Sequence, residues 1–197
     1  MNTTNHLKRG FLAASAIGAA ILSGCDQIAG TSSSGIQPQT VADALHAVLA
    51  ADREVYASKV VNRLVNEEKV IKATEHWQDD KSLPLPAQFF RMSSEQVSAQ
   101  GSNFSYALLS LWPINKKNEA KTDSERVGLQ FVVDHPDQNY YGEEELGGKR
   151  YFTAVYADKA VTEACTACHN NHADTPRTDF KQNDVMGGIV IRIPLGN

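Results

Sequence analysis

The stretch "ACTACHNNH", residues 164–172, holds two of the chain's three cysteines and two of its six histidines. On a helix Cys165, Cys168 and His169 would lie at positions i, i+3 and i+4, so all three would face the same side. Covalent attachment of haem needs this arrangement, because two thiols meet the two vinyl groups on one porphyrin edge and the next histidine reaches the iron. The motif therefore predicts one haem c, with Cys165 and Cys168 as thioether residues and His169 as the proximal iron ligand.

Two other uses of these thiols stay open. A structural zinc site takes four ligands, usually as two separated pairs, and the chain has no second CxxC. His172 could donate a fourth ligand, but Cys168 and His169 are adjacent and cannot easily both close a tetrahedron. A thioredoxin-type redox centre places its first cysteine at a helix N-terminus. We expect Asp158 to cap this helix about two turns before Cys165, which would remove most of that benefit.

The first residues predict an export signal. A short basic region precedes an apolar run from Phe11, which is too short to span a bilayer comfortably. The run ends in "LSGC", which resembles a bacterial lipobox, and the cysteine of that motif is lipidated and becomes the new N-terminus. We therefore expect a lipoprotein signal peptide over residues 1–24 and a lipid on Cys25. A signal peptide cut elsewhere and an uncleaved anchor are the alternatives.

Removal of a lipoprotein signal peptide determines the net charge and the cellular location that we expect for the mature chain. Removal of the leader takes away two basic residues and no acidic ones, which leaves a net charge of −6. A chain without a basic excess has nothing to attract nucleic acid, so no nucleic-acid partner is expected. Membrane attachment would come from acyl chains, at about 0.8 kcal/mol per methylene. Asp26 after the cysteine resembles an inner-membrane retention signal, so we expect a periplasmic protein anchored there by lipid.

Two helices are expected in the first half of the mature chain. Apolar residues near helical spacing, with charged residues between them, predict a long amphipathic helix over residues 40–66. Two prolines lead into a second helical pattern that ends at about Gln100. The small, polar residues before the first helix predict a flexible tether over residues 25–39. Residues 40–197 then form the folded domain.

The second half of the chain predicts mainly strands. Four runs are rich in β-branched and aromatic residues and are bounded by turn formers: Phe104–Ile114, Val127–Asp134, Tyr151–Ala157 and Gly187–Leu195. The acidic run Gly142–Leu146 predicts a solvated loop, and the next two glycines predict a turn. The expected fold class is α+β, with N-terminal helices followed by a small sheet that one helix near the cysteines interrupts.

Several long stretches also carry a resemblance to a known family: "LPLPAQ", "FSYALLSLWPINKKN", "YFTAVYADKAV", "CTACHN" and "DFKQNDVMGGIVI". On these the chain resembles a bacterial single-haem c-type family, classed as a domain of unknown function, whose known fold is PAS-like. Members occur as stand-alone haem proteins, in cyanobacteria among others, and as periplasmic parts of sensor kinases. The resemblance implies a PAS-like antiparallel sheet, N-terminal amphipathic helices and a haem-bearing CxxCH helix.

The sixth position of the iron is not fixed by the motif. Candidate ligands are Met92, Met186, His46 and His76, and an empty or water-bound position is the alternative. Met186 lies in "DVMGG", whose glycines would let the backbone approach a macrocycle closely, although a core methionine would suit the same place. One branch of the family is reported to use a cysteine there, and this chain has none to spare.

Three functions compete. A redox- or gas-responsive sensor module, with a diatomic gas as possible ligand, would pass its signal to a separate protein, because the chain carries no kinase segment. A membrane-tethered electron-transfer protein would instead exchange electrons with a redox partner. An enzyme comes third, because the sequence shows no cluster of acid, base and nucleophile, and peroxidase-like or nitrogen-oxide chemistry would belong to the haem.

Overall fold

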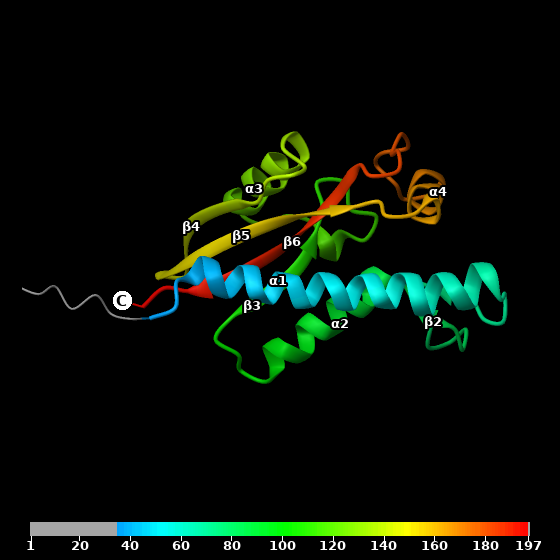
Figure 1. The fold of residues 1–197 in the computed structure, drawn as a ribbon, viewed down its shortest axis with the longest axis horizontal. Helices are drawn as coiled ribbons and strands as arrows, with labels where there is room; N and C mark the ends of the chain where they lie inside the picture. Colours follow the sequence, from blue (N-terminus) through cyan, green and yellow to red (C-terminus); the bar gives the residue numbers. More distant parts are fainter. Residues whose placement is uncertain (1–34, 197) are drawn as a thin grey trace, which may run out of the picture. The chain divides into compact units, whose positions relative to one another are not determined.

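A four-stranded antiparallel sheet organises residues 35–196, the part of the chain that this computed structural model describes (Figure 1). Its strands lie in the order β3-β6-β5-β4, so the first and last strands of the sheet along the chain are neighbours. Their bounds are β3 Ser105–Leu109, β4 Tyr140–Leu146, β5 Lys149–Lys159 and β6 Val185–Pro194. The α+β class is thereby confirmed. The predicted signal peptide and Cys25 lie outside the described residues.

A long helix runs along one face of the sheet (Figure 1). It comprises α1, Pro38–Val55, and continues directly as a π-helical segment, η1, Tyr56–Glu67. Pro38 stands in the first turn, where its missing N–H breaks no helical hydrogen bond. The predicted long helix is confirmed, and its buried side is formed by Ala42, which is fully buried against β5 and β6, with Leu45 and Leu49 packed on the same cluster, whereas Val48 is exposed.

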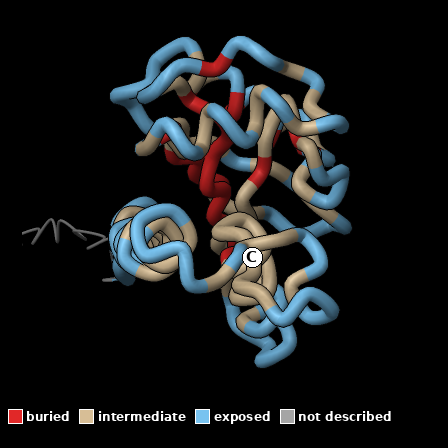
Figure 2. Tube along the Cα trace, turned by 90° about the vertical axis from the view of Figure 1, so that its right-hand side faces the viewer, coloured by how far each residue is buried: buried red, intermediate tan, exposed pale blue. Residues whose placement is uncertain are grey.

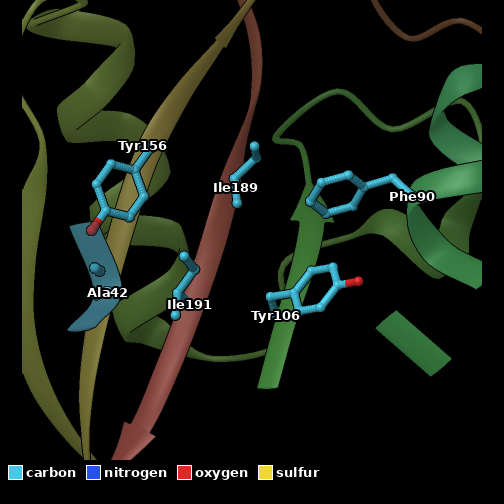
Figure 3. Close-up of a cluster of buried hydrophobic side chains, with 7 residues drawn as sticks. Ala42, Phe90, Tyr106, Tyr156, Ile189 and Ile191 are labelled. Carbon is cyan, nitrogen blue, oxygen red and sulfur yellow. The ribbon is translucent and has the colours of Figure 1, made fainter. Parts of the chain in front are cut away.

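The second predicted helix is also confirmed. α2 covers Pro86–Ala99 and ends before Gly101, whose φ of +71° lies in the left-handed region that glycine adopts without strain. Its one buried residue, Phe90, packs edge-on against Tyr106 of β3 at 5.1 Å between ring centroids. Figure 3 shows this pair next to Ile189 and Ile191 of β6, in the core beneath α1 and α2.

The predicted strand Val127–Asp134 is wrong, because these residues belong to α3, Asp123–Asp134. A capping box starts this helix: the Thr122 hydroxyl accepts from the Glu125 N–H, and the Glu125 carboxylate accepts from the Thr122 N–H. Its buried residues recur at helical spacing and pack on the other face of the sheet. The β-branched composition of the run was outweighed by this capping and periodicity.

The acidic run Gly142–Leu146, predicted as a loop, is also different: it forms most of the edge strand β4. Glu143 pairs with Arg150 across the β4–β5 hairpin, while Glu144 points to Arg192 of β6. The turn after it is confirmed, since both glycines of the hairpin turn have positive φ. Acidic side chains are compatible with a strand here because each of these two has a cationic partner.

The core lies on both faces of the sheet. Alternate residues of β5 and β6 point to opposite sides, one set toward α1 and α2 and the other toward α3. Figure 2 shows the buried residues gathered in the interior, with exposed residues around them. Shorter elements connect the rest, namely β1 Ala73–Thr74, β2 Leu83–Pro84 and η2 Lys116–Asn118. Among residues 35–196, no helix has the length and apolar character needed to cross a membrane.

Candidate functional site

The two neighbouring cysteines lie on a short helix, α4, Glu163–Asn171, between β5 and β6. The prediction that Asp158 caps this helix is wrong. Asp158 is still part of β5, paired with Gly187, and Thr162 occupies the N-cap position with extended backbone. Cys165 therefore lies in the first turn, and its Sγ is 3.3 Å from the Thr162 hydroxyl.

In the first turn, the helix dipole favours the thiolate form of Cys165, as a redox centre requires. Cys168, however, is unsuited to a redox centre. Burial raises the pKa of Cys168, and the nearby Glu75 carboxylate and Cys165 thiol raise it further. A reactive dithiol centre instead depends on a lowered thiol pKa. Both cysteines are free rather than joined in a disulfide.

A cavity of about 370 Å³ brings the whole motif together, because Cys165, Cys168 and His169 all line it. This volume falls within the range of about 300–1,000 Å³ that is usual for ligand pockets. The segment η1 contributes Ala57, Val61 and Val65, which are spaced four residues apart and so lie on one face of the helix. Further walls come from the start of α2 and from the segment that follows β3, including Trp112.

The surroundings of His169 favour its neutral form. Burial lowers its pKa, and the positive charges of His172 and Arg53 lower it further. Its ring meets Phe180 edge-on at 6.3 Å. The next residue, Asn170, fixes this arrangement, since its amide donates to the Phe180 carbonyl at 2.9 Å and accepts from the Phe180 N–H at 3.0 Å. A neutral imidazole held in this way has a lone pair available for a metal ion.

The four candidate distal ligands are placed very differently. Met186 lines the cavity and is buried beside Ala160 and Phe180. Met92 is half-buried on α2 but does not line the cavity. His46 stacks on Tyr156 at 3.9 Å between ring centroids, away from the cavity wall, and His76 is exposed.

The glycines after Met186 have a packing role of their own. A Cβ on Gly187 would come within 2.5 Å of the Leu109 carbonyl oxygen, and one on Gly188 within 2.9 Å of side chains from α3 and β5. The close approach that glycine permits here is therefore to neighbouring strands and helix α3 within the protein.

Arg53 is a cavity residue that sequence reasoning missed. Near the end of α1, it donates through Nη2 to the Asp158 carboxylate at 2.8 Å, and both side chains are largely shielded from solvent. Its Nε is buried and has no hydrogen-bond partner. Helical spacing signals this residue, because Arg53 precedes Ala57, Val61 and Val65 at the same four-residue interval.

Arg177 stacks on Trp112 and Phe180, with its guanidinium carbon 4.5 and 4.3 Å from the ring centroids. It thereby ties the segment after α4 to the segment after β3. Arg177 does not itself line the cavity, and neither does Arg150 of the β4–β5 hairpin, whereas Lys159 does.

The comparisons with known proteins place the chain in a family. The family model for Tll0287-like proteins matches residues 33–194, so the chain belongs to the Tll0287-like family. Among solved structures, the cyanobacterial heme-protein Tll0287 matches with a TM-score of 0.52 and 16% identity, covering 81% of this chain and 97% of that one. At this identity the likeness concerns the fold. A search of curated protein sequences found no match.

Proposed function

We propose that this chain is a covalent c-type monohaem protein, lipid-anchored in the periplasm, that acts as a redox- or gas-responsive module. One observation carries the proposal: the two thiols and the imidazole of CTACH line a single, largely apolar cavity. Cys165 and Cys168 would form the thioether bonds and His169 would bind the iron. Membership in a family that shares its name with a heme-protein supports the same cofactor.

The residues present fit such a group. The apolar ring of haem needs an apolar wall, and Ala57, Val61 and Val65 on one face of η1 supply it. The iron needs a neutral imidazole, and burial favours that form of His169 by lowering its pKa. The haem carboxylates need hydrogen-bond donors, and Arg53, whose buried Nε has no hydrogen-bond partner, lines the same cavity. When bound, the haem would supply one-electron chemistry and a site for a diatomic ligand.

The zinc alternative finds less support. In the described part of the chain, no three His, Cys, Asp or Glu side chains are grouped so as to hold a metal ion. His172, the proposed fourth donor, instead accepts the Asp174 N–H at Nδ1 and lies 3.6 Å from the Glu75 carboxylate through Nε2. Haem iron needs only one nitrogen ligand from the protein, because the porphyrin supplies the other four nitrogens, and His169 can provide it.

The sheet order supports a PAS-like fold for the haem domain, because the first strand lies beside the last with a helix on the far face. Folds of this kind carry many functions, so the role must come from the site. The cavity wall from η1 has no sulfur or imidazole group, and Met186 is packed among core side chains. We therefore favour an iron whose sixth position is open or weakly held, as a responsive module requires.

Absorption spectra of the purified protein, oxidised and reduced, with and without CO, test the proposal. The haem should be attached, and the ferrous form should bind CO rapidly. A Met186→Leu variant should give the same spectra as the wild type. A six-coordinate haem that is inert to CO and loses its sixth ligand in Met186→Leu would instead establish the electron-transfer alternative.

The anchor is tested separately. Cys25→Ser should abolish lipid labelling and release the protein from the inner-membrane fraction into the soluble periplasm. The folded domain should be unaffected, so haem content is the internal control. Retention of Cys25→Ser in the membrane fraction would show that another segment anchors the protein.

A further inference from the structure

Arg53 forms the charged end of the apolar stripe in the cavity. Arg53, Ala57, Val61 and Val65 follow one another at four-residue spacing on the same helix, and all four line the cavity. These four residues therefore form a stripe that is cationic at its first residue and apolar over the three later ones, while the polar residues Ser58, Asn62 and Asn66 of η1 line the cavity beside it. A ligand that matches this stripe has an extended apolar body and an anionic group at one edge.

The guanidinium of Arg53 is held in one orientation, but one of its N–H donors has no hydrogen-bond partner. The ion pair with Asp158 at 2.8 Å orients it, and Asp158 is itself held within β5, so the group has little freedom to turn away. Nε is buried without a partner, and a buried N–H that makes no hydrogen bond is destabilising. The planar fork of arginine suits carboxylates in particular, because parallel N–H donors can engage the two oxygens.

We propose that Arg53 binds a carboxylate of the haem, donating through Nε to a propionate oxygen while Nη2 stays on Asp158. This assignment rests on the proposed haem function and adds the residue that recognises the anionic edge.

The other cations of the cavity wall are less suited. Arg91 is paired with Glu95 on the exposed side of α2, and the Lys159 ammonium is paired with the exposed Asp137. Neither has a buried donor left without a partner within the described residues. Among the cations of residues 35–196, Arg53 alone combines a cavity position, a fixed orientation and an N–H without a hydrogen-bond partner.

Resonance Raman spectroscopy of the haem-loaded protein tests the assignment, because the propionate bending mode rises in frequency when the carboxylate accepts a hydrogen bond. Arg53→Met should lower that frequency. This variant also leaves the buried Asp158 carboxylate without its cation, which could destabilise the protein. The double variant Arg53→Met/Asp158→Asn removes that carboxylate charge as well and should show the same downshift. Asp158→Asn alone keeps the arginine and should leave the mode near the wild-type position.

Arg63→Met is the matched control, because Arg63 lies on the same long helix, is exposed and does not line the cavity. It should leave the Raman mode unchanged. An unchanged mode in both Arg53 variants, or a downshift confined to Arg91→Met, would overturn the assignment. Wild-type protein without attached haem would instead refute the proposed function, so the two failures are distinguishable.

Discussion

Replacement of Arg192 by methionine should destabilise the domain strongly. The guanidinium of this β6 residue donates through Nε to Glu144 of β4 at 2.5 Å and through Nη2 to Glu125 of α3 at 2.7 Å. The three side chains are only 15%, 7% and 5% exposed, respectively, so Arg192→Met leaves two carboxylates buried without a cation. Breaking a buried pair in this way costs about 3–5 kcal/mol.

The loss should depend on pH. Burial alone would raise the pKa of Glu144, but the hydrogen bonds from Arg192 and Thr153, with the arginine charge, outweigh it and hold that pKa below its usual value. Its stabilising contribution is therefore present above about pH 4.3 and lost as pH falls through the lower folded pKa. In Arg192→Met the buried Glu144 carboxylate loses the arginine that lowers its pKa, so the destabilisation should be greatest near pH 7 and smaller near pH 5.

Urea unfolding followed by circular dichroism measures this free energy. The control is Arg150→Met, which breaks an exposed pair with Glu143 on the same hairpin and should cost only about 0–1 kcal/mol. Equal losses for the two variants, or a loss for Arg192→Met that does not change with pH, would refute the argument from burial.

Three further outcomes are expected. Val61→Glu places a charge in the apolar cavity wall and should lower haem content, whereas Val48→Glu, on the exposed side of the same helix, should not; equal haem content in both would exclude η1 from the site. Gly188→Ala should cost about 1–3 kcal/mol in urea unfolding, because the added methyl meets side chains at 2.9 Å, and a neutral result would mean that α3 can shift. Burial lowers the pKa of His46, outweighing the opposing charge of Asp43, so the stability that it contributes is present above about pH 6.5 and lost as pH falls through its lower folded pKa. His46→Phe, which can still stack on Tyr156, should flatten this dependence of the melting temperature, and an unchanged profile would assign it to another group.

The sequence predicted the elements whose signal is local. The long helix over residues 40–66 shows apolar residues at helical spacing. Pro84 and Pro86 mark where α2 begins, and Gly101 marks where it ends. The runs that became β5 and β6 are rich in β-branched residues buried on both sides. Each of these signals lies within the element itself.

Two predictions are wrong because the composition of a segment is a weaker signal than its periodicity or its pairing partners. The helix α3 carries a capping box at Thr122 and Glu125 and buried residues at helical spacing, and both were visible in the sequence. The acidic strand β4 could not be recognised alone, since Glu144 is accommodated by Arg192, 48 residues later in the chain. A contact at that distance leaves no local signal.

The candidate site was predictable in its chemistry and not in its surroundings. The spacing of Cys165, Cys168 and His169 is enough to place them on one side of a helix. The cavity itself depends on η1, more than 90 residues earlier, meeting α4, and only folding brings Arg53 to Asp158. The misassigned cap at Asp158 has the same origin, because that residue extends β5 and pairs with Arg53.

Covalent attachment is the most direct test of the central claim. The protein should be produced in cells that mature c-type cytochromes, and its intact mass and its colour after acid-acetone extraction should be measured. The wild type should carry the mass of one haem and keep its pigment, and Cys165→Ala/Cys168→Ala should carry none covalently. A colourless wild type, or a pigment that acid acetone removes from it, would contradict the account.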